Sequence, residues 1–383
     1  MLPHCPLPAC RPLLAVLAEI PDLRKARGKR HPLDSLLALV CVAVLCGYRS
    51  YSAVAQWARI YPAELVRALG ITHPTPPCAA TLCTVLRQLD RAEVEAKLGA
   101  WAEEVLASLP PAPEEDEAIA LDGKSLRGSQ RQGVLQGHLL SALSHRLGLT
   151  MGQQAVDDKT NEIAVVLPLL QGLVLEGRIF TMDALLTQRA VATTITAAGG
   201  DYVLIAKENQ PQLHADIKLV FTDPPLDDEQ PRVETVDSGH GRIEHRRLTV
   251  SSALVGYTDW PGLQQVFQLE RRTILKKTGE VRGETVYGLT SLAPARADAA
   301  RLLRLTRQHW TIENRAHWVR DVTFAEDHSQ VRCGSTPEVM AAIRNTAIGL
   351  LRASGATNIV AACRQCAAQP ARALALIGIA VEN

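Results

Sequence analysis

Apolar residues recur at spacings of three and four along the N-terminal part of the chain, which is the period of a helix. The spacing runs through Leu33–Leu45, Tyr51–Ile60 and Ala80–Leu106, with few strand signals between them. The segment that follows, Pro110–Glu117 (PPAPEEDE), combines proline with acidic residues and is typical of a linker. The pattern therefore predicts an all-α N-terminal domain over residues 1–110.

Beyond the linker, short apolar runs that end in polar residues alternate with helical stretches, which is typical of an α/β domain. The expected strands are Ala118–Asp122, His138–Ser144, Leu147–Val156, Arg178–Asp183 and Asp201–Ala206, the second and third forming a hairpin. The expected helices are one from near Asn161 that is interrupted at Pro168, then Gln188–Ala198, Asp298–Arg320 and Pro337–Arg352. Residues 211–292 are rich in Thr, Val, Gly and charge, and predict a mainly β segment that we interpret as an insertion.

Length and composition limit the class of protein. The chain has 383 residues, of which 47% are hydrophobic, so it has room for two or three domains with a substantial core. Its longest apolar run, Leu36–Gly47, is much shorter than the roughly 20 residues of a membrane-spanning helix, and it predicts a buried helix instead. No secretory signal is recognisable. We therefore expect the protein to act in the cytoplasm.

The cysteines indicate reduced thiols rather than a disulfide framework. Nine of them are scattered without a regular spacing. Cys363 and Cys366 form a C-x-x-C, but a second ligand pair for zinc is missing and the spacing suits packing in an alanine-rich helix. We interpret this pair as structural.

The net charge is +1, whereas neutralising DNA phosphates requires lysine and arginine that face the duplex. The basic residues are nevertheless clustered. The clusters comprise Arg24, Lys25, Arg27, Lys29 and Arg30; Arg242, Arg246 and Arg247; and Arg271, Arg272, Lys276 and Lys277. Such clusters are compatible with a DNA-binding surface and equally with an ordinary solvated one.

Two of the predicted strands end on an aspartate, Asp122 in ALDGKSLRG and Asp183 in FTMDALLTQ. Carboxylates at strand ends can meet at one edge of a sheet, where they repel each other unless a cation lies between them. Mg²⁺ prefers such oxygen ligands. The alternative is that each aspartate only caps the turn or helix that follows it.

A third acid lies in Arg307–Arg332, where a helix would carry one stripe of an acid among cationic or ionisable side chains. The members of the stripe are His309, Glu313, His317 and Arg320. Trp310 and Trp318 lie at an angle to the stripe and are expected to anchor the helix against the core. The stripe predicts either a metal-binding glutamate with phosphate-holding neighbours or an exposed, salt-bridged helix.

Seven motifs occur in order along the chain. They are DGKSLRGS from Asp122, DDKTNEI from Asp157, MDALLTQ around Asp183, AKENQPQL from Ala206, HGRIEHR from His240, YGLTSL from Tyr287 and HWTIENRAHWVRDVTFAEDHSQVR from His309. Together they resemble the H-repeat-associated, ISAs-type transposases of bacterial insertion sequences, a branch of the DDE superfamily. The helical N-terminal part also resembles the domain that accompanies this family. The resemblance implies an α/β fold with a ribonuclease H-like catalytic core and a β-rich insertion.

The resemblance also implies an activity and a site. Asp122, Asp183 and Glu313 would be the catalytic, metal-binding acids of a DNA transposase that cleaves and transfers strands at the ends of its insertion sequence. The cofactor would be Mg²⁺, with Mn²⁺ as an alternative. The partners would be the terminal inverted repeats and the target DNA, bound by a homodimer at the bacterial nucleoid and without a membrane. The side chains expected to contact DNA are Lys124, Arg127, Lys207, Arg242, His245, His309 and Arg320.

Five parts of the chain follow from the pattern and the resemblance together. They are a helical domain that binds DNA ends (1–110), the first part of the catalytic domain (111–210), the β-rich insertion (211–292), the second part of the catalytic domain with the glutamate helix (293–355) and a C-terminal helical tail (356–383).

This chain departs from the wider relatives at the glutamate helix, where they carry a Tyr, Arg, Glu, Lys signature. The corresponding residues are Thr306, His309, Glu313 and Arg320. The tyrosine and the arginine are thus replaced, whereas Arg320 keeps the positive charge. Glu208, in KENQ, stands where we would expect glycine.

Several alternatives stay open on the residues alone. Glu326 and Asp327 compete with Glu313 for the place of the third acid, and Asp321 is a weaker rival because it lies off the stripe. The function also has two rivals. One is a domesticated or inactive relative that binds DNA without cutting it, and the other is a ribonuclease H-like nuclease unconnected with transposition.

Overall fold

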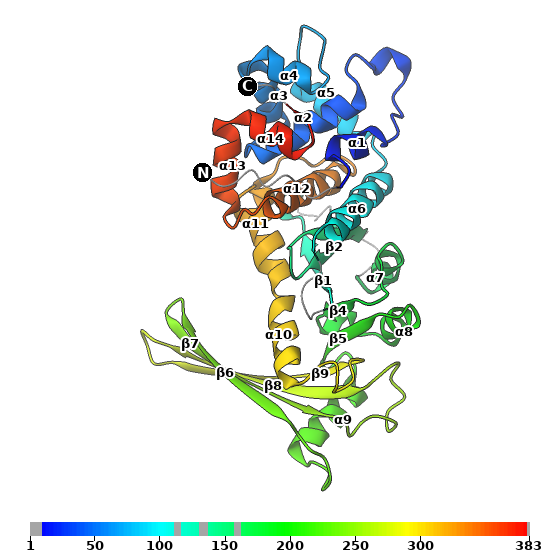
Figure 1. The fold of residues 1–383 in the computed structure, drawn as a ribbon, viewed down its shortest axis with the longest axis vertical. Helices are drawn as coiled ribbons and strands as arrows, with labels where there is room; N and C mark the ends of the chain where they lie inside the picture. The colour runs from blue at the N-terminus through cyan, green and yellow to red at the C-terminus, as the bar shows by residue number, and fades with distance from the viewer. Residues whose placement is uncertain (1–9, 111–115, 130–136, 157–161, 381–383) are drawn as a thin grey trace. The chain divides into compact units, whose positions relative to one another are not determined.

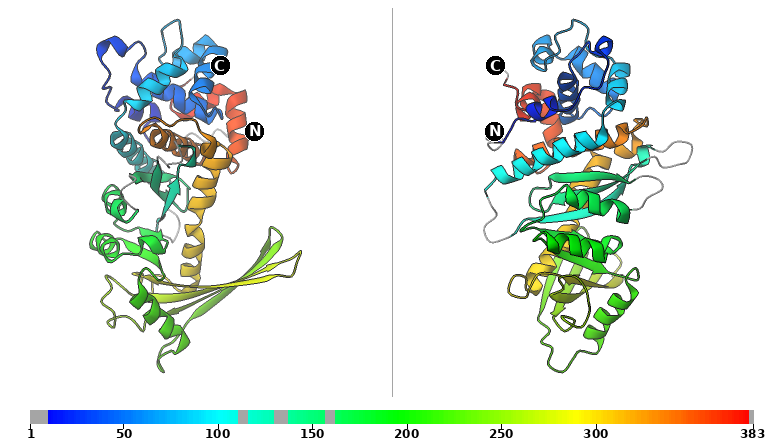
Figure 2. Two further views of the ribbon diagram at one scale, coloured as in Figure 1. Left: turned by 180° about the vertical axis from the view of Figure 1, so that it is seen from behind. Right: turned by 90° about the vertical axis from the view of Figure 1, so that its right-hand side faces the viewer.

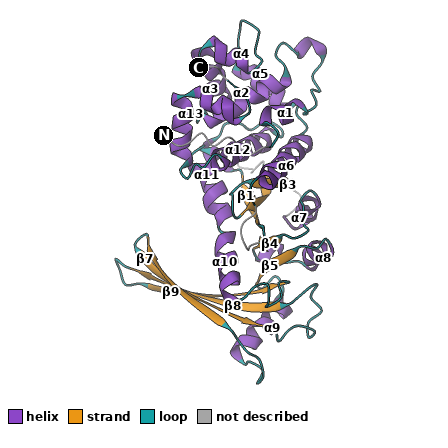
Figure 3. Cartoon of the chain, in the orientation of Figure 1, coloured by secondary structure: helices purple, strands orange, loops and turns teal. Residues whose placement is uncertain are grey.

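The computed structural model describes residues 10–110, 116–129, 137–156 and 162–380 (Figure 1). The chain forms two compact units. The helical unit comprises Met1–Pro113, Gly123–Asn161 and Ile312–Asn383, and the sheet unit comprises Glu114–Asp122 and Glu162–Thr311. Figure 3 shows the helices and strands of the chain. The fold is mixed α/β, with a helical N-terminal region and a large sheet. The five predicted domains stay a prediction.

The N-terminal region is helical, as predicted. Its helices are α1 (Leu13–Ala18), α2 (Leu33–Leu45), α3 (Tyr51–Ile60), α4 (Ala63–Ala68), α5 (Ala79–Arg87) and α6 (Arg91–Ser108), of which α1 and α4 were not among the predicted segments. The stretch expected over Ala80–Leu106 is two helices, because the Asp90 side chain accepts from the backbone N–H groups of Ala92 and Glu93 and starts α6 anew. As expected from its apolar sequence, α2 is buried. None of the helices in the described part of the chain is long and apolar enough to cross a membrane.

The helical unit also contains a hairpin and the C-terminal helices. Strands β2 (His138–Ser144) and β3 (Thr150–Val156) pair antiparallel as predicted. The helices are α11 (Trp318–Val322), α12 (Thr336–Ala353), α13 (Ile359–Ala368) and α14 (Pro370–Leu376). The central element is α12, which packs against α2, α6 and β3. In α13, Cys363 and Cys366 are buried free thiols, which supports their structural interpretation.

Gln153 of β3 ties three elements of the helical unit together. Its side-chain amide donates to Glu95 Oε1 of α6 at 2.9 Å and to the Glu338 carbonyl of α12 at 3.2 Å, and it accepts from Asn345 Nδ2 of α12 at 2.9 Å. Burial raises the pKa of the Glu95 carboxyl to about 7, although the hydrogen bond from Gln153 and the charge of Arg91 lower it. The contact between the N-terminal helices and the hairpin is therefore sensitive to pH.

Replacing Glu95 with glutamine is expected to stabilise the protein near pH 8 and to change little near pH 4.5. The pKa of Glu95 in the folded protein, about 7, lies above its ordinary value of 4.5. The stability that the protonated acid contributes is therefore fully present below pH 4.5 and lost as the pH rises through 7. The gain in unfolding free energy is on the order of 3 kcal/mol, measured by urea unfolding at the two pH values. Glu64→Gln, on an exposed side chain of α4, is the control. Equal effects of Glu95→Gln at both pH values would contradict the prediction.

In the sheet unit the strands lie in the order β1-β4-β5-β9-β8-β7-β6. Their bounds are β1 (Ala118–Ser125), which continues into the helical unit, β4 (Ile179–Met182), β5 (Asp201–Ala206), β6 (Arg232–Gly239), β7 (Arg242–Ser251), β8 (Gln265–Leu275) and β9 (Val281–Thr290). Strands β1, β4 and β5 pair in parallel, and each pair from β5 onward is antiparallel. The predicted strands are confirmed, and the β-rich segment extends the same sheet through β9.

Two details of this unit differ from the prediction. Helix α7 (Glu162–Gln171) continues through Pro168 instead of breaking there, because Val166, Leu169 and Leu170 are buried on both sides of the proline. The residues from 157 to 161, including Asn161 and most of the DDKTNEI motif, lie outside the described residues. Residues 211–292, predicted to be mainly β, begin with the helix α9 (Pro211–Thr222), whose first residue is a proline that suits a helix start.

Helices cover both faces of the sheet. Helix α10 (Ala299–His309) contacts β6 and β7, whereas α9 contacts β8 and β9 on the opposite face (Figures 1 and 2). Alternate residues of the strands point to opposite faces. Val286 accordingly belongs to the core under α10, and the neighbouring Tyr287 packs against the ring of His214 in α9. Helix α8 (Arg189–Ala197) lies on β5.

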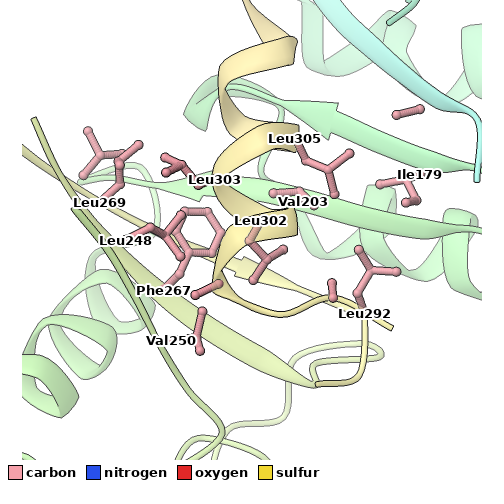
Figure 4. Close-up of a cluster of buried hydrophobic side chains, with 14 residues drawn as sticks. Ile179, Val203, Leu248, Val250, Phe267, Leu269, Leu292, Leu302, Leu303 and Leu305 are labelled. Carbon is pink, nitrogen blue, oxygen red and sulfur yellow. The ribbon is translucent and has the colours of Figure 1, made fainter. Parts of the chain in front are cut away.

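The core beneath α10 follows the two periods that the sequence carries. Leu248 and Val250 of β7 and Phe267 and Leu269 of β8 are two residues apart and face inward, against leucines of α10 at helical spacing (Figure 4). The leucines are Leu302, Leu303 and Leu305. This packing holds α10 on the same sheet that carries Asp122 and Asp183.

Candidate active site

Asp122 and Asp183 occupy adjacent positions on neighbouring parallel strands of the sheet unit. The pairing of β1 with β4 ends at Leu121 opposite Met182; Asp122 is the next residue of β1, and Asp183 is the residue that follows β4. The expectation that carboxylates meet at one edge of the sheet therefore fits the register. One detail was wrong, because β1 does not end at Asp122 but continues to Ser125.

The Asp183 carboxylate has two partners in the sheet unit. It accepts from the backbone N–H of Ala184 at 2.7 Å and so caps the short helix η3 (Ala184–Leu186), and it lies 3.6 Å from Lys207 Nζ. Both the Asp183 and Lys207 side chains are about half exposed. Asp183 therefore caps η3, as the alternative interpretation expected. Its carboxylate nevertheless faces solvent beside Lys207, at the carboxyl ends of β4 and β5.

Two of the sequence motifs bind one another at this edge. In the AKENQPQL motif, Asn209 Nδ2 donates to the Ala184 carbonyl at 2.6 Å and Gln210 Nε2 to the Thr187 carbonyl at 3.0 Å. Thr187 of MDALLTQ donates in return to the Ile205 carbonyl at 2.6 Å. The loop after Asp183 is thus held by side chains of the loop after β5. Glu208 takes no part in these bonds and is exposed.

His309, predicted to contact DNA, is buried. Its Nδ1 lies 3.0 Å from Thr181 Oγ1 of β4, and the ring is 7% exposed. Burial lowers the pKa of His309 to about 4, against the opposing effect of Asp183, so the ring is neutral near pH 7. Thr306 is also buried and donates to the Leu303 carbonyl. The structure corrects the prediction for His309, because a buried neutral ring cannot reach a phosphate.

In the helical unit, Glu313 begins a π-helical turn, η4 (Glu313–His317). The regular helical stripe expected here is therefore interrupted, and such turns are frequent at functional sites. Glu313 Oε2 lies 3.3 Å from His317 Nδ1, with the glutamate half exposed and the histidine buried. The hydrogen bond with His317 lowers the pKa of Glu313, with a further contribution from the charge of Lys124. Glu313 is thus ionised, and this acid and histidine are close enough to share a metal ion.

Arg315 fixes the π turn to the β2–β3 hairpin. Its guanidinium donates to the carbonyls of three successive turn residues, at 2.9, 3.0 and 2.8 Å. These residues are His145, Arg146 and Leu147. The following residue, Gly148, has a φ of +65°, and a Cβ there would lie within 2.8 Å of the Arg315 and Arg352 guanidinium groups. The turn thus requires glycine where the two arginines approach.

Replacing Arg315 with lysine is expected to destabilise the helical unit and loosen this turn. An ammonium group is a point donor and cannot span three carbonyls as a planar guanidinium does. The loss of unfolding free energy should be about 2–4 kcal/mol, since hydrogen bonds to charged groups contribute about 1.5–3 kcal/mol each. Hydrogen exchange of amides in residues 144–149 should accelerate. Arg59→Lys, on an exposed side chain of α3, is the control, and unchanged exchange in Arg315→Lys would contradict the prediction.

Three basic side chains of the helical unit form ion pairs with acidic residues of the same unit. Lys124 Nζ lies 2.6 Å from Asp321 Oδ2. Arg320 is fully buried and donates to Glu326 Oε2, and Arg344 Nη1 of α12 donates to Glu326 Oε1 at 2.8 Å. The structure thus corrects the predicted DNA contacts of Lys124 and Arg320. Of the rivals of Glu313, Glu326 is buried between two arginines and Asp321 is partly buried beside a lysine, whereas Glu313 is half exposed, so we keep Glu313 as the proposed third acid.

The remaining side chains predicted to contact DNA, and the two tryptophans, are exposed. Arg127, Arg242 and His245 are exposed, as DNA contacts need to be, and their role stays a prediction. Trp310 and Trp318 were expected to anchor the helix in the core, but they are 48% and 54% exposed. The π turn gives the reason for Trp318, because an extra residue in a turn changes which side chains face inward.

Several members of the three basic clusters pair with neighbouring acids. Arg24 is buried against Asp22, Arg246 pairs with Asp237 and Glu244, and Arg247 pairs with Glu234 and Glu270. In the third cluster, Arg271 pairs with Glu284. The pattern of charge along the sequence therefore overstated the positive surface, because cross-strand neighbours supply acids that sequence proximity does not show.

Comparisons with known proteins show the family to which this chain belongs. Residues 113–350 match the family described as "Transposase DDE domain", and residues 14–102 match the family described as "DDE_Tnp_1-associated". The chain belongs to the DDE transposase family. Its members cut DNA and transfer strands with the help of divalent metal ions, so DNA is a partner of this protein.

The curated relatives are similar over most of the chain. "H repeat-associated putative transposase YhhI" of Escherichia coli K12 is 28% identical over 88% of this chain and 90% of its own length. "Putative transposase YncI" of Escherichia coli O157:H7 is 29% identical over 89% and 87%. "Uncharacterized protein in dhlA 3'region" of Xanthobacter autotrophicus is 36% identical over 71% and 92%. The predicted resemblance to H-repeat-associated transposases is confirmed.

Proposed function

We propose that this protein uses Asp122, Asp183 and Glu313 as the metal-binding acids for cleavage and strand transfer at the ends of its own insertion sequence. The observation that carries the proposal is the position of Asp122 and Asp183, next to each other at the ends of the paired segments of β1 and β4. The ionised, half-exposed Glu313 supplies a carboxylate that suits a divalent ion. The parallel order β1-β4-β5 and the β2–β3 hairpin support a ribonuclease H-like core extended by a β-rich segment.

Divalent ions bound by these acids, Mg²⁺ or Mn²⁺, would lower the pKa of the attacking water or DNA 3′-hydroxyl and stabilise the leaving oxygen. The residues of this chain orient that chemistry. Lys207 holds Asp183 from the β5 loop, and Arg315 holds the π turn of Glu313 against the hairpin. Arg127, Lys207, Arg242 and His245 are the exposed side chains that we propose for contact with the DNA backbone.

The proposal extends to partners and location. Two DNA ends have to be brought together for transfer, so we expect a homodimer on DNA. The terminal inverted repeats and the target DNA are its substrates, and we expect the N-terminal helices to bind the repeats. We expect the reaction to take place in the cytoplasm, at the bacterial nucleoid.

The test is cleavage of DNA fragments that carry the terminal repeats flanking the gene. The full-length protein with Mg²⁺ or Mn²⁺ should nick the labelled fragment at the repeat boundary, and EDTA should abolish the nick without releasing the DNA. A scrambled repeat is the control. A nuclease unconnected with transposition would cut both fragments alike, and a domesticated DNA-binding protein would bind the repeats and cut neither. Either result would refute the proposal.

A further inference from the structure

The π turn η4 joins two side chains that the proposed function does not use together. Glu313 and His317 are its first and last residues. The turn sets a ring nitrogen beside the carboxylate. A π turn adds a residue to a helical turn and disturbs the regular hydrogen-bond ladder, and such turns concentrate at functional sites.

The separation of the two ligand atoms suits a shared metal ion. His317 Nδ1 lies 3.3 Å from Glu313 Oε2. An ion with bonds of about 2.1 Å at right angles keeps neighbouring ligand atoms about 3.0 Å apart, so little movement is needed to admit it. We propose that His317 is a ligand of the divalent ion at Glu313 and binds it through Nδ1. This inference rests on the proposed function of Glu313.

Burial distinguishes this pair from an ordinary surface pair on a helix. The His317 side chain is 3% exposed, whereas that of Glu313 is 55% exposed. The ring is therefore held in place by the protein and presents Nδ1 toward a carboxylate that solvent and substrate can reach. A ligand that is fixed before the ion arrives loses little conformational freedom on binding.

A nitrogen ligand has a consequence for metal choice. Mg²⁺ favours oxygen ligands and nearly ideal octahedral geometry, whereas imidazole suits transition metals. Mn²⁺ stands between the two classes, because it accepts carboxylate, water and imidazole. A site with His317 should therefore bind Mn²⁺ more tightly relative to Mg²⁺ than the same site without it. The sequence left the preference between these ions open, and this residue decides it.

Pulsed electron paramagnetic resonance on the full-length protein with Mn²⁺ tests the inference directly. We expect a bound Mn²⁺ with coupling to one directly coordinated ¹⁴N. His317→Gln should remove that coupling and weaken Mn²⁺ binding by about tenfold or more, with a smaller loss for Mg²⁺. His328→Gln changes an exposed histidine of the same motif and should leave the coupling and both affinities unchanged.

The outcomes separate this inference from the proposed function. If wild-type protein binds Mn²⁺ without ¹⁴N coupling, and Glu313→Gln removes that ion, His317 is not a ligand and the role of Glu313 stands. If Glu313→Gln leaves both the ion and the coupling intact, the proposed function of Glu313 fails as well. The wild-type spectrum decides the question even where His317→Gln does not fold.

Discussion

Replacing Glu313 with glutamine is expected to abolish strand cleavage while binding of the terminal repeats is retained. Glutamine has nearly the same shape but no negative charge, so it cannot hold a divalent cation in the same way. A metal ion contributes several kcal/mol to a transition state of this kind. Each 1.36 kcal/mol is a factor of ten in rate, so the cleavage rate should fall by at least about a thousandfold.

The measurement is single-turnover cleavage of a labelled end fragment, with gel mobility shift to follow binding. Glu176→Gln, on an exposed loop residue of the sheet unit, is the matched control and should cut at the wild-type rate. Because Glu313 is half exposed, its replacement should leave the unfolding transition nearly unchanged. Cleavage by Glu313→Gln at a rate near that of wild type would transfer the role of third acid to another residue.

Replacing Glu326 with leucine is expected to cause the largest loss of stability. Glu326 is 3% exposed and lies between Arg320 and Arg344, which are both buried. Removing the shared carboxylate leaves two buried positive charges without their partner. Breaking a buried ion pair in this way costs about 3–5 kcal/mol of unfolding free energy.

Denaturant unfolding measures this loss of unfolding free energy. Two further variants serve as controls. Asp327→Asn alters the neighbouring acid and should cost much less, because Asp327 is not held by the two arginines. The triple variant Arg320→Met, Glu326→Leu, Arg344→Met should recover most of the stability, since an apolar set can replace a buried triad. A single Glu326→Leu variant within about 1 kcal/mol of wild type would show that the triad is solvated.

The stability that Glu326 contributes between the two arginines is also expected to depend on pH. Burial alone raises the pKa of Glu326, but the charges of Arg320 and Arg344 outweigh it and lower the pKa below its ordinary value. The carboxylate therefore contributes stability above its ordinary pKa, and this stability is lost as the pH falls through the lowered one. Glu95 has the opposite sign, because its pKa is raised. Acid should weaken the contact of α11 with α12 while it strengthens the contact of α6 with the hairpin.

The elements of this protein could be predicted because their signals are local. Helical spacing in Tyr51–Ile60 and apolar runs such as Asp201–Ala206 give the bounds that the structure shows. Two segments differ from the prediction because contacts with residues distant in sequence decide their structure. Pro168 does not end α7, and residues from Pro211 form a helix although the segment as a whole is rich in β-forming residues. In both places burial against the rest of the unit outweighs propensity.

In the candidate site, too, the features carried by local motifs could be predicted and those that depend on distant residues could not. Asp122, Asp183 and Glu313 could be proposed from the sequence because each lies in a motif of consecutive residues. The ion-pair partners of these charges were not recognisable, since Lys124 and Asp321 are far apart in sequence, as are Glu326 and Arg344. The π turn was equally hidden, because it depends on how Arg315 binds the hairpin carbonyls.

By itself the sequence determined the order of helices and strands and the family, and it proposed the three acids, since periodicity and motifs are carried by neighbouring residues. Only the tertiary structure decided which charged and ionisable side chains are buried or paired. It buried His309, Lys124 and Arg320, enclosed Glu326 between two arginines, and set His317 beside Glu313. The physical reason is that desolvation and pairing of a charge depend on residues distant in sequence, and the fold alone brings these together.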